Sequence, residues 1–429
     1  MKRHMKRFLW TLLLLLLICP FCKAAQEEAV SHFTAGVNDT RSGNQTNALV
    51  ELSLAIKLDP QYKDAYFLRG SAKFGLKDYK GAISDFTEVV RLAPANEAEN
   101  GAAFFSRGLC KSALNDFNGA LGDYEEAIRI NSNNASAYRY RGMTQAALRN
   151  WEGALGDFDR FFALHGGDAE SYRICGFAKA ALKDYPGALA YFNKVIGLTP
   201  GDADAYASRA NIKAQSGDFD GANADLEKAL QFGPNNAGVF IARGFLKAKR
   251  GDDDGASADF NRATHLAPAA PEGYLYLGML QFNSSQLGPA LDNLSKAVVS
   301  NCPEDDPRFY IWLIKTQIGR ADDGNMELGA YLNSLQGVKS KEWQAAIGRF
   351  LIGDLPESDF IAQAGINTNR PSAIIDQVSD AYFYAGMKHL LAGDKKGAVG
   401  LFQQCLNAGD DNNFGNWSAR AELRALKQH

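Results

Sequence analysis

The amino-acid sequence predicts an all-α fold, a solenoid of helix–turn–helix units. Alanine recurs in steps of 34 residues, with one step of 38, at Ala48, Ala82, Ala120, Ala154, Ala188, Ala222, Ala256 and Ala290. Glycine follows the same period twelve residues earlier, at Gly36, Gly70, Gly108, Gly142, Gly176, Gly244 and Gly278, and Ala210 occupies the remaining position. A fixed period of this length indicates a solenoid, in which every unit packs against its neighbours.

The unit at residues 203–236 shows how the period arises. Apolar residues recur at helical spacing on both sides of the polar turn 216–218. The small residues Ala210 and Ala222 let the two helices approach closely, and Pro234 ends the second helix. Because two short helices cannot bury their apolar faces alone, each pair must pack on the next.

These units resemble tetratricopeptide repeats. The pattern of an aromatic, a small residue, alanine, an aromatic, a second small or apolar residue and proline is seen at Tyr66, Gly70, Ala82, Phe86, Val89 and Pro94, and again at Phe240, Gly244, Ala256, Phe260, Ala263 and Pro268. The resemblance covers eight units over residues 29–304. It implies a right-handed superhelix that binds a protein or a peptide.

The rest of the chain departs from the period and then returns to it. Residues 305–378 keep helical patterns without the regular small residues, so we expect degenerate helical repeats there. Residues 379–412 read as a ninth repeat, with Tyr382, Gly386, Ala398 and Phe402 in register, and residues 413–429 as a capping helix. The stretches 342–358, 381–402 and 421–423 are similar to the NlpI family of bacterial envelope lipoproteins, which implies an adaptor that tethers wall-processing enzymes.

Residues 1–24 have the layout of a signal peptide. Basic residues precede the apolar run 8–18, and small residues follow at positions 24 and 25. We expect an exported protein, periplasmic or extracellular, with the bacterial envelope favoured and no stable membrane insertion after cleavage; a retained anchor is the alternative. Neither Cys19 nor Cys22 follows a small residue, so lipid attachment is disfavoured.

The charge of the mature chain argues against nucleic acid as a partner. Removing the five positive charges of residues 1–24 from a chain of formal charge −3 leaves about −8.

Known catalytic and metal-binding motifs are missing from the sequence. It contains no His-Glu-x-x-His, no P-loop and no Gly-x-Ser-x-Gly, and the acidic stretch 251–255 reads as an inter-helix turn rather than a calcium loop. Cysteines 110, 175, 302 and 405 lack paired spacing, which favours free core thiols. We therefore expect no enzyme, metal or cofactor. One alternative is an enzyme with an unrecognised site in residues 305–378; another is a structural spacer within an envelope complex.

Five units carry an arginine just before the small residue and an aspartate sixteen residues later. The pairs are Arg69–Asp85, Arg107–Asp123, Arg141–Asp157, Arg209–Asp225 and Arg243–Asp259. The unit with Cys175 in place of the arginine has Tyr191 in place of the aspartate, so the two positions vary together. We predict an ion pair within each of the five units, because guanidinium and carboxylate groups match in shape.

The family resemblance also implies that the first helix of each unit lines the concave groove. The groove positions selected as binding residues are Phe67, Phe74, Phe105, Arg139, Met143, Arg173, Phe177, Asn211, Phe245 and Met279. This groove is largely apolar, and we expect Arg139 and Arg173 to receive an acidic group of the partner, since no acid occupies the matching positions of adjacent units. The alternative is that these side chains pack between neighbouring first helices. Only Asn211 fits the carboxylate clamp of the family.

The predicted function is an exported scaffold or adaptor for a protein or peptide, and a homo-oligomer is left open.

Overall fold

The computed structural model describes residues 24–92, 98–300, 302, 306–366, 371–408 and 414–428. The predicted signal peptide lies outside the described residues except for its last position. The described chain is helical throughout, which confirms the predicted all-α solenoid. It divides into two compact units, Met1–Gly201 and Asp202–His429, with a boundary inside the predicted array 29–304.

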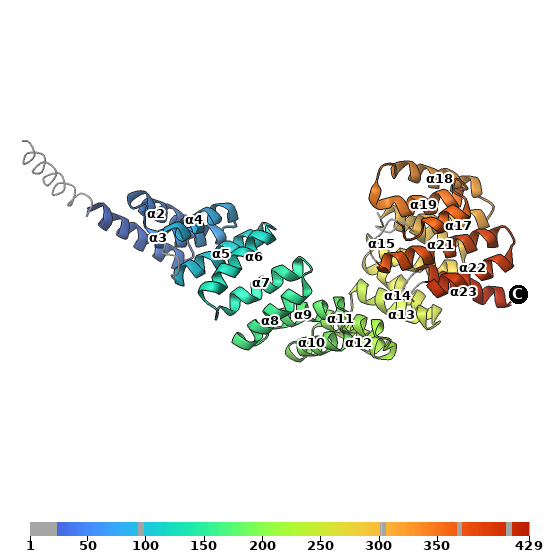
Figure 1. The fold of residues 1–429 in the computed structure, drawn as a ribbon. Coiled ribbons are helices and arrows are strands. Elements are labelled where there is room, and N and C mark those ends of the chain that lie inside the picture. Colours follow the sequence, from blue (N-terminus) through green and yellow to red (C-terminus); the bar gives the residue numbers. More distant parts are fainter. Residues whose placement is uncertain are drawn as a thin grey trace, which may run out of the picture. The chain divides into compact units, whose positions relative to one another are not determined.

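The described part of unit 1 consists of successive antiparallel helix pairs (Figure 1). Residues 24–41 are helical. They are followed by α2 (Gln45–Leu58), α3 (Lys63–Gly75), α4 (Tyr79–Leu92), α5 (Ala98–Ala113), α6 (Phe117–Ile130), α7 (Ala135–Ala147), α8 (Trp151–His165), α9 (Ala169–Ala181) and α10 (Tyr185–Leu198). The odd-numbered helices α3 to α9 are the first helices of their repeats, and each packs against the second helix that follows it.

Unit 2 continues the same pairing and then adds longer-range contacts. Its helices are α11 (Ala203–Gln215), α12 (Phe219–Phe232), α13 (Ala237–Lys249), α14 (Asp253–Leu266), α15 (Pro271–Asn283), α16 (Leu287–Val299), α17 (Asp306–Gln317), α18 (Ala321–Ser334), the 3₁₀ turn η1 (Lys339–Lys341), α19 (Glu342–Ile352), α20 (Glu357–Gln363), α21 (Pro371–Leu391), α22 (Lys395–Ala408) and α23 (Phe414–Gln428). Helices α17 to α19 occupy the stretch without a regular period, and α21 pairs with α22.

The turn between the two helices is built in the same way in most repeats. An aspartate caps the second helix in most of them, as where Asp252 accepts a hydrogen bond of 2.9 Å from the backbone N–H of Gly255, and Asn150 does so for α8. This assigns the acidic stretch 251–255 to a helix cap. The residue before the cap has a left-handed backbone. At Gly251 φ is 79°, which glycine adopts without strain. At Arg149 φ is 59°, and there the side chain makes the left-handed conformation costly.

The recurring glycine keeps the two helices of a repeat close together. A Cβ atom added to Gly244 would lie 2.7 Å from the ring of Phe260, and one added to Gly176 would lie 2.8 Å from Phe192. Both rings are fully buried. The period of small residues is therefore set by aromatic side chains of the second helix packing against the first.

All five predicted arginine–aspartate pairs are confirmed. In each, Nε and one terminal nitrogen of the arginine donate to the two oxygens of the aspartate, at 2.6–2.9 Å. The aspartate side chains are at most 6 % exposed. Each guanidinium also lies 5.2–5.7 Å from the centre of an aromatic ring three residues earlier in its own helix.

A lysine four residues after the arginine, which the sequence reasoning missed, completes four of these pairs. Lys73, Lys111, Lys213 and Lys247 each lie 2.8–2.9 Å from an oxygen of the same aspartate. Burial by itself raises the pKa of Asp225, yet the hydrogen bonds from Arg209 and Lys213 outweigh it and hold that pKa below its ordinary value. The fifth pair has Gln145 at the lysine position, and the side-chain oxygen of Gln145 has no hydrogen-bond partner.

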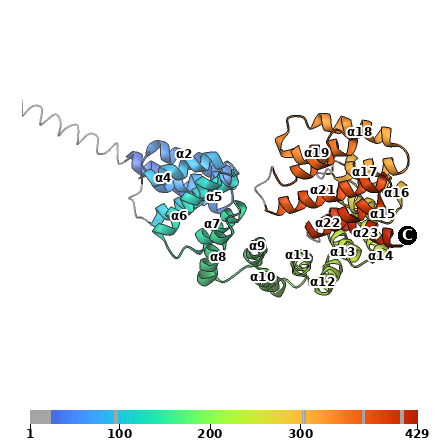
Figure 2. The same cartoon turned by 45° about the vertical axis from the view of Figure 1, so that its right-hand side comes forward.

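Helix α23 is built into the core of unit 2. It packs against α21, α22 and α15 (Figure 2). The hydroxyl of Ser418 lies 2.8 Å from that of Tyr310, and Asn416 accepts a hydrogen bond of 2.9 Å from Ser379. Cysteines 110, 175, 302 and 405 are free and buried.

Candidate functional site

The predicted groove positions of unit 1 lie on one continuous surface. Helices α3, α5, α7 and α9 contact one another in order, so their outward sides form a single surface, the first-helix face. Phe67, Phe105 and Met143 are half-buried on these helices, whereas Phe74 and Phe177 are 37 % and 46 % exposed. The face therefore presents apolar side chains from all four of its helices.

The aromatic rings of this face are fixed by the repeat core beneath them. Phe67 meets Phe86 at 5.6 Å and Phe177 meets Phe192 at 5.2 Å, both edge to face. A cavity of about 320 Å³ opens beside Phe67, with Val89 and Phe33 among its apolar walls. Rings held this way keep their outer surface in place without further ordering, which favours binding.

Arg139 has two acidic partners within the chain, although no acid occupies the matching groove positions of adjacent units. Its Nε donates to Asp168 at 3.1 Å and a terminal nitrogen donates to Glu170. Burial lowers the pKa of Arg139, but the hydrogen bonds to these two carboxylates more than offset it, so the pKa lies above its ordinary value.

The acids that pair with Arg139 come from the start of α9, where Asp168 is the N-cap, and not from a groove position. Arg139 therefore links α7 to α9. Arg173 lies half-buried on α9 and also has an interaction within the chain. The pairing of acidic partner groups with these two arginines remains a prediction. For Arg139 it can no longer be argued from a missing acid, because Asp168 and Glu170 already pair with its guanidinium.

In unit 2 the corresponding positions are covered to different extents. Asn211 is exposed on α11 and accepts a hydrogen bond of 3.4 Å from Gln215. Phe245 is half-buried, with its ring centre 6.2 Å from that of Trp417 on α23. Met279 is completely buried and is a core residue in this structure, because α15 packs against α17 and α23.

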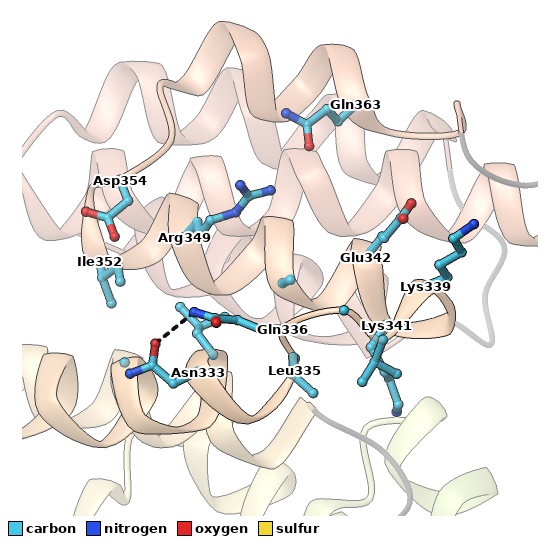
Figure 3. A pocket seen from close by; sticks show the side chains of 15 residues that line it. Asn333, Leu335, Gln336, Lys339, Lys341, Glu342, Arg349, Ile352, Asp354 and Gln363 are labelled. Carbon is cyan, nitrogen blue, oxygen red and sulfur yellow. Dashed lines mark hydrogen bonds between the residues drawn. The ribbon is translucent and has the colours of Figure 1, made fainter.

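A cavity of about 850 Å³ lies in residues 305–378, where an enzyme site was the alternative (Figure 3). Its charged residues include Glu342, Arg349 and Asp354, which are exposed and point in different directions. The one hydrogen bond drawn among the lining side chains joins Gln336 to Asn333, at 3.3 Å. The labelled side chains of this cavity therefore do not form the convergent cluster of ionisable groups that is typical of an active site.

The described residues also bear on metal binding and membrane insertion. They contain no group of three or more His, Cys, Asp or Glu side chains placed to hold a metal ion. Nor does any helix in the described part of the chain have the length and apolar character needed to cross a membrane.

Comparison with known families identifies the repeats. A family model described as tetratricopeptide repeat matches residues 63–96, and a second model of the same description matches residues 105–169 and 178–237. None of the curated proteins matches this sequence.

Solved structures similar to this chain have low sequence identity to it. The C-terminal part of a tetratricopeptide repeat protein from Cytophaga hutchinsonii is 19% identical, with a TM-score of 0.50 over 57% of this chain and 99% of that one. A repeat protein from Parabacteroides merdae is 20% identical, with a TM-score of 0.42 over 56% of this chain and 93% of that one. YrrB, described as having an unusual peptide-binding site, is 19% identical, with a TM-score of 0.39 over 44% of this chain and 95% of that one.

Proposed function

Because this chain is built from tetratricopeptide repeats, a scaffold suited to binding proteins and peptides, we propose that it is an exported adaptor. Its partner segment lies on the first-helix face of unit 1. The segment is an amphipathic helix or extended peptide whose apolar side chains contact Phe67, Phe74, Phe105 and Phe177. The chain carries no reaction of its own in this proposal.

The observation that carries the proposal is the exposure of Phe74 and Phe177 on the same face as the cavity beside Phe67. Fully burying an exposed phenylalanine side chain gains roughly 1.5–3 kcal/mol. Phe74 and Phe177 are 37 % and 46 % exposed, so each supplies less than half of that gain, to which the cavity adds further apolar contact. The equivalent face of unit 2 offers less of this surface, since Met279 is buried and the half-buried ring of Phe245 packs edge to face against Trp417. Unit 1 is therefore the better candidate.

Export is part of the proposal, and it rests on residues 1–24. Their basic start, apolar run and small residues at 24–25 have the layout of a cleaved signal. The similarity of the C-terminal third to envelope lipoproteins also favours the bacterial envelope. Intact-mass measurement of the protein from its own envelope is the test: we expect a chain starting at Ala25 or Gln26, and a retained Met1 or an added lipid contradicts the proposal.

The binding surface is tested with a matched pair of variants. Phe74→Ser with Phe177→Ser removes the two exposed rings of the first-helix face. Leu164→Ser with Leu198→Ser removes two slightly more exposed apolar side chains, 42 % and 54 % exposed, from the second helices α8 and α10. We expect the partner recovered from the envelope fraction with the parent chain to be retained by the leucine variant and lost from the phenylalanine variant. Equal recovery with all three chains moves the binding site away from this face.

A further inference from the structure

A second cavity, in unit 2, combines apolar walls with positive charge. It encloses about 280 Å³ between α13 and α23, and we call it the α13–α23 cavity. The rings of Phe245 and Trp417 form part of its apolar wall. This volume is at the lower limit of small-molecule sites, so it holds about one large side chain and its flanking groups.

All the charged residues that line the α13–α23 cavity are cationic. They are Lys249, Arg420, Arg424 and Lys427, and no aspartate or glutamate is among the described residues that line it. Three of them come from α23 at spacings of four and three residues, which places them along one side of the helix. Glu422, the one acidic residue of α23, does not line the cavity.

The cations differ in how they are held. The Lys249 ammonium lies 5.0 Å from the ring centre of Phe245 and 5.9 Å from that of Phe219. Arg424 and Lys427 are exposed, and the described residues offer neither of them an ion-pair partner. Lys249 and Arg420 have interactions within the chain. The exposed cations Arg424 and Lys427 repel each other at the cavity, and an incoming anionic group relieves that repulsion.

We propose that the α13–α23 cavity binds an acidic segment of a partner protein, one that carries an aromatic side chain between carboxylates. The aromatic ring packs against Phe245 and Trp417, and the flanking carboxylates accept hydrogen bonds from Arg424 and Lys427. Inorganic phosphate satisfies only the charges and leaves the apolar wall in water. An anionic lipid surface is flat, whereas these groups line a concave site. The proposal is independent of the first-helix face, since every lining residue belongs to unit 2.

The test uses the full chain and the labelled peptide Glu-Glu-Phe-Glu-Glu, with fluorescence anisotropy as the readout. Arg424→Glu with Lys427→Glu reverses two exposed cavity charges. Lys228→Glu with Arg262→Glu makes the same charge change at exposed positions on α12 and α14, outside the cavity. We expect about tenfold weaker binding or more for the cavity variant, and little change for the control. Circular dichroism checks that both fold, and the milder Arg424→Gln with Lys427→Gln gives the same direction if charge reversal disturbs α23.

Three comparisons separate this site from its alternatives. Glu-Glu-Ala-Glu-Glu binds more weakly than the phenylalanine peptide, binding falls as salt rises, and Phe74→Ser with Phe177→Ser leaves it unchanged. Equal binding to parent and cavity variant overturns the proposal. Inorganic phosphate or the alanine peptide competing as well as the phenylalanine peptide reduces the cavity to a simple anion site. Binding to phosphatidylglycerol vesicles that depends on the same two cations assigns it to a membrane surface instead; either result overturns a peptide site.

Discussion

Removing the guanidinium of Arg141 is expected to destabilise unit 1 more than removing any other arginine of the paired set there. Asp157 is 6 % exposed and receives two hydrogen bonds from Arg141, at 2.8 and 2.7 Å. In the preceding repeat Asp123 is paired with Arg107 in the same way, but Lys111 also lies 2.8 Å from it. The two repeats therefore differ in what remains when the arginine is lost.

The magnitudes follow from that difference. Arg141→Ala leaves a buried carboxylate with no cation, which costs about 3 kcal/mol or more. Arg107→Ala leaves Asp123 with Lys111 and removes only charged hydrogen bonds, which costs about 1.5–2 kcal/mol. For a unit of this size each kcal/mol corresponds to about 2–4 °C in melting temperature, so the Arg141 variant should melt several degrees below the Arg107 variant.

A third substitution distinguishes this explanation from a packing defect. Gln145→Lys places a lysine where the other repeats have one, and it replaces a side-chain oxygen that has no partner. It should stabilise the parent by about 1 kcal/mol and recover at least that much in the Arg141→Ala background. Thermal melts followed by far-UV circular dichroism measure the parent and the four variants. Equal losses for the two arginine variants, or no recovery from the lysine, refute the idea that residual cations set the cost.

Three other predictions concern the turns, the helix contacts and pH. Arg149→Gly should raise the free energy of unfolding by about 1 kcal/mol in urea melts, because it relieves a left-handed backbone at φ 59°, while Gly251→Arg should lower it. Gly244→Ala should cost about 1–3 kcal/mol by the same measurement, since the added Cβ would meet an aromatic ring at 2.7 Å; unchanged stability contradicts the close packing. Finally, the hydrogen bond with Asp394 raises the pKa of His389, so the stability contributed by His389 is fully present below its unfolded pKa of about 6.5 and lost as pH rises through the folded pKa. The deficit of His389→Gln should thus be larger at acidic than at alkaline pH, and a pH-independent deficit argues against the pairing.

Features that repeat with the period were predictable from sequence. The small residue at each helix crossing and the arginine–aspartate pairs recur in several units, so the chain supplies its own comparison. The loss of both charges in the unit with Cys175 and Tyr191 was the most informative case. The lysine at positions such as Lys111 also recurs with the period, but it was not predicted as a third member of the pairs. An arginine and an aspartate already balance each other in charge, so the pattern offered no reason to expect another cation.

Features that depend on contacts between residues distant in sequence could not be predicted by comparing one repeat with another. The burial of Met279 results from α17 and α23 packing on α15, and nothing in its own repeat distinguishes it from an exposed groove position. The partners of Arg139, Asp168 and Glu170, lie at the start of α9 and not at the groove positions that the repeat pattern aligns. The local sequence predicts that Asp168 caps α9, but it does not predict that this carboxylate also pairs with Arg139 on α7.

The burial of α23 against α15 and α17 also affects how the two units reach their native states. In unit 1 the paired aspartates are only sixteen residues from their arginines, so its repeats gain their main contacts as each helix pair closes. In unit 2 the hydroxyls of Tyr310 and Ser418 meet across 108 residues of chain, and that loop must close before the core they share exists. We therefore expect unit 1 to fold by stepwise addition of neighbouring repeats, and the later part of unit 2 to fold more slowly and in one cooperative step.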